Sequence, residues 1–404
     1  MTDFTPIDSS AVATAWNAVM LQNYGTPKIE IVRGSGCYVT DSNGREYLDL
    51  LAGIAVSSIG HAHPAISEAI ISQASTLLHT SNLYAHASGL RLAERLLALA
   101  DSHGKVFFAQ DGATANEAAL KLARRHGLAA APDGSKQVFV AAHNGFHGRT
   151  MGSLAVTGNP AKREPFGPFG YEVRFVDFGD VDALTAAMDS SVCALILEPI
   201  QGEGGLNVPP PGYLESARTL ATKFNAVFIA DEVQSGIGRT GSWFASHAQG
   251  VRPDIITLAK GLGGGLPIGA MIVEPAFVDV LKPGDHGTTF GGSPISTRAA
   301  LAVIDVIEND GLLAHVEMAS DWLFQNILGL GHPAIQTVRG RGLWLAIVLT
   351  ADNAAAVELA ALEAGFLVNA VKPNAIRLAP PLNISVDELA TFVAALPAIL
   401  DRAA

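Results

Sequence analysis

TLAKGLGGGLP (residues 257–267) and AVFIADE (residues 226–232) decide the fold of this chain. Lys260 directly follows the apolar run of the first stretch, and Asp231 ends the apolar run of the second. Two β-like runs separated by helix and loop predict neighbouring parallel strands. In an open α/β sheet, ligands bind beyond the carboxyl ends of the strands. We therefore expect Lys260 and Asp231 to face one crevice.

An amine and an acid at one crevice suit a particular chemistry. A lysine amine can condense with an aldehyde, and a neighbouring carboxylate favours the protonated form of a pyridine nitrogen. Pyridoxal 5'-phosphate requires both from its protein. The pair predicts that Lys260 and Asp231 are catalytic residues acting with this cofactor.

Length and composition set the outer limits of the interpretation. At 404 residues the chain exceeds a typical single domain, which predicts a large domain with a smaller companion. It is 49% hydrophobic with a mean hydropathy of +0.29, which favours an extensive subunit interface. A net charge of -12, with 26 Lys and Arg and no basic runs, argues against nucleic-acid and membrane surfaces. Small-molecule partners fit better.

The cysteines and the N-terminus indicate the compartment. Cys37 and Cys193 allow at most one bridge and have no metal-binding spacing, so a reducing compartment is the simpler interpretation. The first ten residues contain early acids, and no apolar run approaches the roughly 20 residues of a membrane span. We expect a soluble, cytoplasmic protein.

The order of apolar runs predicts an α/β fold with two domains. Short runs alternate with helix-like segments through the middle of the chain, which predicts a mainly parallel sheet covered on both faces. After about residue 310 the pattern becomes α+β, and Ser385 with Glu388 has the capping-box spacing at the start of a last helix. We expect residues 1–58 to pack with a C-terminal small domain (310–404) and residues 59–309 to form the large domain. The expected strands of the large domain are 105–109, 137–141, 172–178, 192–198, 226–231, 254–259 and 268–273. In the small domain we expect the apolar run 337–349, a helix around 351–364 and strands near 366–371 and 375–379.

A phosphate site is expected where strand 105–109 meets the next helix. Gly112 and Ala113 begin that helix, and a glycine there lets backbone N–H groups and the helix N-terminus approach an anion. In isolation an ordinary turn is the alternative. A nicotinamide-binding interpretation of GLGGG (261–265) is weaker, because its spacing is wrong and no acid follows at the usual distance.

Further candidates lie in HNGFHGRT (143–150) and in three other stretches. His143 and His147 have the spacing of a metal pair on a helix, but two glycines oppose a helix there, so we predict no metal. Phe146 could stack on a cofactor ring and Arg149 could bind a carboxylate, or both could be ordinary packing and surface residues. Glu198, Glu203 and Arg377 could reach the crevice or be surface charges, and Thr288 with Thr289 could contact phosphate or form a turn.

Taken together and in order, these stretches resemble the class III (ω-amino) pyridoxal phosphate-dependent aminotransferases of fold type I over nearly the whole chain. Within that family, LAGIAVSSIGHAHP (51–64), SNLY (81–84) and LVNAVKPNAIRLAPPL (367–382) are most similar to acetylornithine aminotransferases. The motifs that carry the family resemblance are GATANEAALKLAR, FHGRT, EPIQGEGG, DEVQSGIGRTG, AKGLGGGLPIGA, HGTTFGG and IRLAPPL.

The resemblance implies a role for each matching residue. Lys260 matches the Schiff-base lysine, and Asp231 matches the acid beside the pyridine nitrogen. Thr289 would reach the phosphate from the partner subunit, which implies a homodimer with shared active sites. The other implied cofactor contacts are Gly112 and Ala113 at the phosphate, Val233 and Phe146 on the two faces of the ring, and Gln234 near its phenolic oxygen.

The implied substrate contacts are Arg149, Arg377 and Glu203. The two arginines match carboxylate-binding residues, and Glu203 matches the acid that pairs with Arg377 when no α-carboxylate is present. The implied reaction converts N2-acetyl-L-ornithine and 2-oxoglutarate to N-acetyl-L-glutamate 5-semialdehyde and L-glutamate, in arginine biosynthesis. The alternatives are a transaminase of succinylornithine, ornithine or 4-aminobutyrate, an aminomutase, and a catalytically silent cofactor-binding homologue.

The chain departs from the family pattern at the phosphate turn. Where relatives usually have Asn-Ser-Gly-x-Glu-Ala, residues 110–115 read Gln-Asp-Gly-Ala-Thr-Ala. An acid beside a phosphate dianion is repelled by it. We therefore expect Asp111 to lower cofactor affinity, and this departure is what favours the silent homologue. Ser293, in place of the usual asparagine after Gly292, should matter less.

Overall fold

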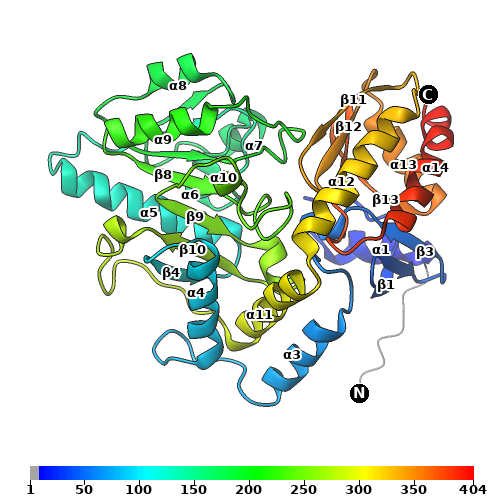
Figure 1. Cartoon of the computed structure of the whole chain (residues 1–404), viewed down its shortest axis with the longest axis horizontal. Coiled ribbons are helices and arrows are strands. Elements are labelled where there is room, and N and C mark those ends of the chain that lie inside the picture. The colour runs from blue at the N-terminus through cyan, green and yellow to red at the C-terminus, as the bar shows by residue number, and fades with distance from the viewer. Residues whose placement is uncertain (1–8) are drawn as a thin grey trace.

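The computed structural model describes residues 9–404 and is built around a seven-stranded sheet, with helices on both faces (Figure 1). Neighbouring strands run parallel, except that β10 is antiparallel to both β4 and β9. The predicted α/β fold with a mainly parallel sheet is confirmed. In spatial order the strands are β4 (Lys105–Ala109), β10 (Gly269–Val273), β9 (Ile255–Leu258), β8 (Val227–Asp231), β7 (Val192–Leu197), β5 (Val138–Ala142) and β6 (Val173–Val176).

The central strands are apolar on both faces because helices cover both faces. Every residue of β5, β7, β8, β9 and β10 is buried, as is typical of parallel strands inside an α/β sheet. Alternate residues face opposite layers: Phe139 packs with α5, whereas Val140 packs with α8 and α9. The helices of this part are α3 (Pro64–Ala74), α4 (Ala87–Leu99), α5 (Gly112–Ala130), α6 (Met151–Ala155), α7 (Pro160–Arg163), α8 (Val181–Ala187), α9 (Tyr213–Lys223), α10 (Ala245–Ala248) and α11 (Pro294–Asn309), with short 3-10 turns η1 (Glu164–Phe166), η2 (Lys260–Gly263) and η3 (Pro275–Phe277).

The C-terminal part contains a second sheet, which is antiparallel. The apolar run 337–349 contributes to two antiparallel strands, because the chain reverses at Gly340 and Gly342, with φ of 131° and 61°. The Ser385 hydroxyl accepts from the Glu388 N–H, so the expected capping box is confirmed. The elements are α12 (Leu312–Gly329), β11 (Ile335–Gly340), β12 (Leu345–Leu349), α13 (Ala354–Ala364), β14 (Asn369–Lys372), β15 (Ala375–Leu378) and α14 (Val386–Arg402), with sheet order β11-β12-β15-β14.

A third sheet combines strands from the N-terminal and C-terminal parts of the chain. β13 (Phe366–Leu367) pairs in parallel with β3, so the expected strand 366–371 is divided between two sheets. The expected domain boundaries near residues 58 and 309 stay a prediction. The sheet order is β1-β2-β3-β13, and its other strands are β1 (Ile31–Ser35), β2 (Tyr38–Asp41) and β3 (Glu46–Asp49). The short helix α2 (Ala52–Ala55) follows β3.

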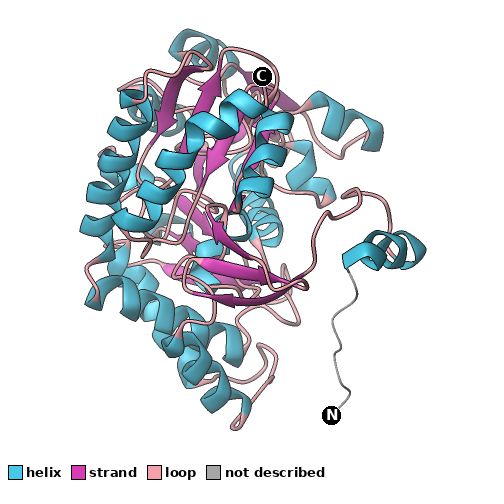
Figure 2. Cartoon of the chain, turned by 90° about the vertical axis from the view of Figure 1, so that its right-hand side faces the viewer, coloured by secondary structure: helices cyan, strands magenta, loops and turns pink. Residues whose placement is uncertain are grey.

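The first described helix, α1 (Ser9–Val19), lies to the side of the three sheets (Figure 2). Val19, Leu21 and Tyr24, at its end and in the following loop, are each more than 80% exposed. None of the helices in residues 9–404 has the length and apolar content that a membrane span requires.

Candidate active site

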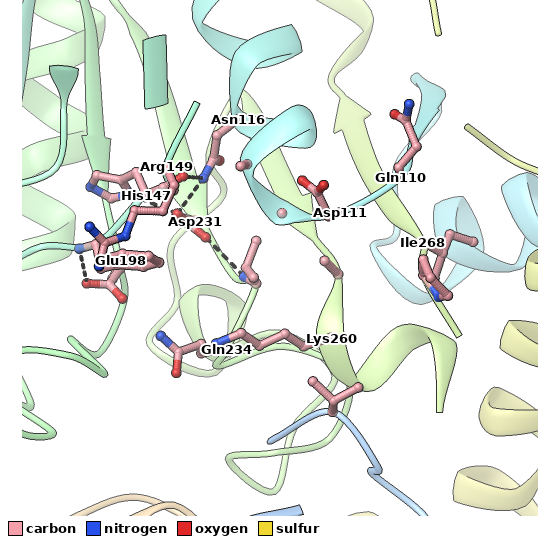
Figure 3. Close-up of a pocket in the computed structure, with 18 of the residues that line it drawn as sticks. Gln110, Asp111, Asn116, His147, Arg149, Glu198, Asp231, Gln234, Lys260 and Ile268 are labelled. Atoms are coloured by element: carbon pink, nitrogen blue, oxygen red, sulfur yellow. Dashed lines mark hydrogen bonds and ion pairs between the residues drawn. The ribbon is translucent and has the colours of Figure 1, made fainter. Parts of the chain in front are cut away.

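A cavity of about 420 Å³ opens at the carboxyl ends of the central strands, where ligands bind in open α/β sheets. Its volume lies within the range of small-molecule sites, roughly 300–1,000 Å³. β8 and β9 are neighbouring parallel strands, as predicted, and Asp231 pairs with Thr257 in their register. Lys260 and Asp231 both line the cavity (Figure 3).

Lys260 begins the short turn η2 that follows β9. Its φ of 42° lies in the left-handed region, which residues other than glycine seldom adopt. Burial, assisted by the positive charge of Arg377, lowers the pKa of the Lys260 amine to about 8, although nearby acids oppose the shift. A much larger fraction of this amine is therefore neutral at physiological pH than in an ordinary lysine.

The Asp231 carboxylate is almost fully buried and is held by three donors. Its Oδ2 accepts from Asn116 Nδ2 at 2.7 Å and lies 2.7 Å from His147 Nδ1. Its Oδ1 accepts from the Val233 N–H at 3.1 Å. Two carboxylate oxygens offer about four acceptor positions, so one remains for a further donor from the cavity.

Asn116 and His147 have fixed orientations at this carboxylate. Thr257 Oγ1 donates to Asn116 Oδ1 at 2.7 Å, so the amide nitrogen must point to Asp231, and it also donates to the His147 carbonyl. Because a carboxylate only accepts, His147 Nδ1 is the protonated nitrogen of that contact. His147 Nε2 is buried and has no hydrogen-bond partner among the described residues.

The turn before α5 lies at the same cavity, and both Gly112 and Ala113 line it. They are the first residues of the helix, where backbone N–H groups have no partner within the helix. A Cβ at position 112 would lie 2.7 Å from Val233 Cγ1, so glycine is required for the close approach. The turn therefore has the form of an anion site at a helix N-terminus.

Asp111 caps the N-terminus of α5. The sequence interpretation overlooked this capping role. Its Oδ1 accepts from the Thr114 N–H at 2.8 Å, and Thr114 Oγ1 accepts from the Asp111 N–H at 3.1 Å. The family pattern Ser-Gly-x-Glu also has capping-box spacing, so this chain has exchanged the positions of the acid and the hydroxyl. Asp111 lines the cavity, and its charge stands one turn closer to the start of the helix than the family's glutamate.

Phe146, Val233 and Gln234 also line the cavity, and Arg149 is at its exposed side. HNGFHGRT is a loop rather than a helix, as its glycines predicted. The Phe146 N–H donates to Glu198 Oε2 at 3.2 Å. Burial, and then the charge of Asp231, raise the pKa of Glu198 well above its usual value. A protonated Glu198 therefore fits beside Asp231.

Arg377 and Glu203 form an ion pair next to the cavity without lining it. Arg377 Nη1 donates to Glu203 Oε1 at 2.6 Å and, more weakly, to Gln234 Oε1 at 3.4 Å. Arg377 Nη2 donates to Asn369 Oδ1 at 2.7 Å. Burial raises the pKa of Glu203, but Arg377, with smaller contributions from two lysines, lowers it overall. Glu203 is therefore ionised and covers the arginine.

Thr289, like the neighbouring candidate Thr288, lies outside this group. It is exposed and does not line the cavity. Its loop is fastened to a neighbouring loop, because Asn82 Nδ2 donates to the carbonyls of Thr288 and Gly291.

The sequence interpretation missed Asn116 and assigned no role to His147 other than in a metal pair. A signal for Asn116 was available, since it lies one helical turn after Gly112 and so on the side of α5 that carries the phosphate turn. His147 gave no local signal, because its contact with Asp231 depends on the folding of the loop after β5.

The chain matches the aminotransferase class-III family over residues 19–400. It belongs to the class III aminotransferases. This family depends on pyridoxal phosphate. The chain is 55% identical over 390 residues to the acetylornithine aminotransferase of Mycobacterium tuberculosis, covering 96% of each chain. It is similar in structure to the ornithine aminotransferase of Toxoplasma gondii (TM-score 0.92, 33% identity, 97% of this chain and 95% of the other). It is also similar to the N-acetylornithine aminotransferase of Stenotrophomonas maltophilia (TM-score 0.83, 34% identity, 94% of this chain and 97% of the other).

The cavity of this class III aminotransferase fits pyridoxal phosphate. The amine of Lys260 and the free acceptor position of Asp231 face it from adjacent strands. The N–H groups at the start of α5 are available to a phosphate, and Val233 and Phe146 supply apolar surface between these groups. Each part of the cofactor thus has a chemically suitable partner.

Removing the Asn116 amide should loosen Asp231. In Asn116→Ala the carboxylate, the His147 carbonyl and the Thr257 hydroxyl each lose a buried partner, so we expect the free energy of unfolding to fall by about 1–3 kcal/mol. Urea denaturation of the apoprotein measures this. Thr257→Val removes only the bond that orients the amide and should cost less, so an equal or larger loss in Thr257→Val would contradict this account.

Removing the charge of Asp111 should tighten cofactor binding. Asn caps helices about as well as Asp, so Asp111→Asn keeps the cap and removes only the repulsion of the phosphate. We expect the Kd for pyridoxal phosphate to fall several-fold, measured by titrating apoprotein and following absorbance. An unchanged or higher Kd in Asp111→Asn would show that the acid does not oppose the phosphate. The control Asp111→Ala also loses the cap and should lower stability by about 0.5–2 kcal/mol.

Proposed function

We propose that this protein transfers the terminal amino group of N2-acetyl-L-ornithine to 2-oxoglutarate, producing N-acetyl-L-glutamate 5-semialdehyde and L-glutamate, in arginine biosynthesis. The observation that carries the proposal is the 2.6 Å ion pair between Arg377 and Glu203 beside the Lys260 cavity. The 55% identity to an acetylornithine aminotransferase supports the choice of substrate.

The ion pair answers a problem of two substrates. Glutamate presents its α-amine and needs a cation for the neighbouring carboxylate, whereas acetylornithine presents its terminal amine, with no carboxylate next to it. Arg377 is 2% exposed, so leaving its buried charge unpaired while acetylornithine is bound would be costly in free energy. Glu203 neutralises it for acetylornithine and must move aside for glutamate. Arg149, exposed and without an ion pair among the described residues, is available to the distant carboxylate.

Each catalytic role follows from the environment of the residue. When bound, pyridoxal phosphate accepts the amino group and the electrons released from the adjacent C–H bond. Lys260 Nζ, with its lowered pKa, would hold the cofactor before the substrate arrives. Once released, the amine would remove the proton from the amine-bearing carbon of the substrate and deliver it to the aldehyde-derived carbon of the cofactor. Asp231, with one acceptor position free, would hold the ring nitrogen of the bound cofactor and favour its protonated form.

The remaining residues bind and orient. Gly112 and Ala113 would hold the phosphate through their backbone N–H groups, Val233 and Phe146 would pack against the ring, and Gln234 would bind near its oxygen. Glu198 keeps Phe146 in place through the bond to its N–H.

We also propose a cytoplasmic homodimer in which Thr289 contacts the phosphate in the partner's cavity. Its exposed position outside the cavity of its own chain suits that role. Phe290 beside it is 63% exposed, and Leu83 and Tyr84, in the loop fastened to it through Asn82, are 84% and 72% exposed. An exposed apolar area of this kind is typical of a subunit interface.

The absorption spectrum of the cofactor-loaded protein tests the activity directly. We expect acetylornithine to abolish the long-wavelength band of the cofactor and 2-oxoglutarate to restore it, with much weaker responses to ornithine, succinylornithine and 4-aminobutyrate. Lys260→Ala should give no such cycle. A stronger response to one of the other amines would identify that amine as the substrate instead of acetylornithine. The absence of a cofactor band at saturating cofactor would favour the catalytically silent homologue.

The pKa of Lys260 predicts how cofactor capture depends on pH. Only the neutral amine attacks an aldehyde, and its fraction rises as the pH increases through the pKa of about 8. The rate at which apoprotein takes up pyridoxal phosphate covalently should therefore rise up to about pH 8 and level off above it, as stopped-flow absorbance would record. A rate still rising in proportion to hydroxide concentration at pH 10 would indicate an ordinary lysine.

A further inference from the structure

Glu203 lies between two cations, and the second of them has no role in the function proposed above. Glu203 Oε1 accepts from Arg377 Nη1 at 2.6 Å, while Oε2 lies 4.0 Å from Lys162 Nζ. Lys162 belongs to the short helix α7, which Asn159 caps through the Lys162 N–H. Each oxygen of one carboxylate thus faces a different positive charge.

The two cations differ in burial and in mobility. The Arg377 side chain is 2% exposed and is also bonded to Asn369, whereas the Lys162 side chain is 36% exposed and ends a flexible four-carbon stem. Lys162 Nζ also lies 5.6 Å from the centre of the Phe146 ring, and Phe146 lines the cavity. Glu203 is its single ion-pair partner within residues 9–404.

We propose that Lys162 receives the Glu203 carboxylate when a dicarboxylate substrate displaces it from Arg377. The inference rests on the proposed function, because it requires a substrate whose carboxylate takes the place of Glu203. Lys162 is then a positioning residue that acts through Glu203 and does not contact the substrate.

Charge balance explains why a receiving cation is needed. A substrate carboxylate that pairs with Arg377 leaves Glu203 half-buried, unpaired and next to a second negative charge. At 4.0 Å, Lys162 is already at the limit of an ion pair, so a small movement of either side chain closes the contact. Arg377 is released for the substrate while Glu203 keeps a partner.

The two half-reactions should depend on Lys162 unequally. Binding of 2-oxoglutarate or glutamate requires Glu203 to leave Arg377, whereas acetylornithine leaves their ion pair closed. Loss of Lys162 should weaken the dicarboxylate half-reaction and leave the acetylornithine half-reaction nearly unchanged.

Lys372 provides a matched control. Its Nζ donates at 3.1 Å to Oδ1 of Asn144, which belongs to the same loop as Phe146. It forms no ion pair among the described residues, so Lys372→Met removes an ammonium from the same region without affecting Glu203.

Binding of glutarate to the cofactor-loaded protein tests the proposal without turnover. Glutarate has both carboxylates of the substrate and no reacting group, and calorimetry gives its Kd. We expect Lys162→Met to raise the Kd about three- to fivefold, the upper part of the range for a solvent-accessible ion pair, while Lys162→Arg and Lys372→Met stay within about twofold of the unchanged protein. In single-turnover absorbance, kcat/KM for acetylornithine should change less than about twofold in Lys162→Met.

A double-mutant cycle with Glu203→Gln separates Lys162 from direct substrate contact. In Glu203→Gln the side chain carries no negative charge with which Lys162 could pair. Adding Lys162→Met to that variant should therefore leave its Kd for glutarate unchanged. An equal loss in both backgrounds would mean that Lys162 binds the ligand itself, and no loss in either would mean that it has no part in the exchange; both results overturn the proposal. Failure of glutarate to bind the unchanged protein would instead overturn the proposed function and this inference with it.

Discussion

The buried charge of Asp231 is the constraint around which the cavity is organised. An ionised carboxylate inside an apolar sheet is stable only when hydrogen bonds replace its lost water. Here the donors come from α5, from the loop after β5 and from the backbone after β8. Satisfying one acid therefore fixes the relative positions of three segments that are far apart in sequence. Asn116 connects this network to the phosphate turn, because both belong to the first turns of α5.

Arg377 is a second buried charge, and its environment is organised in a different way. Asn116 and His147, two partners of Asp231, are themselves buried, and Asn116 is fixed on its far side by Thr257, which restrains that network. The main partner of Arg377 is Glu203, which is 26% exposed and lies in a loop rather than in a strand or helix. Asp231 is held in one position, whereas Arg377 can exchange Glu203 for another carboxylate. This difference suits a site in which the cofactor stays in place while the two substrates alternate.

Much of this arrangement could be predicted from the sequence, because its signals are local. The apolar runs around 226–231 and 254–259 indicated buried parallel strands, and the ends of such strands place Asp231 and Lys260 at one edge. The capping box at Ser385 could also be predicted, from the spacing of Ser385 and Glu388. The spacing of Asp111 and Thr114 carried the same kind of signal, but the interpretation considered only the repulsion between an acid and a phosphate.

Other features depend on contacts that no local pattern specifies. His147 meets Asp231 because of the path of a loop. The run 366–371 gave one strand by its composition, yet its first residues pair with β3 and the rest with β15, since two separate sheet edges were available. The ion pair between Glu203 and Arg377 was inferred from the family resemblance, because the local sequence around neither residue indicates it.

The pairing of β13 with β3 has a consequence for the order of events during synthesis. Residues 46–49 leave the ribosome more than three hundred residues before Phe366 and Leu367, which complete the edge of their sheet. Until then the β3 edge has unpaired backbone groups, the kind of edge that recruits other strands. The N-terminal sheet can be completed only once nearly the whole chain has been made. A polypeptide truncated before residue 366 would keep that edge open and would be a candidate for aggregation or for recognition by chaperones.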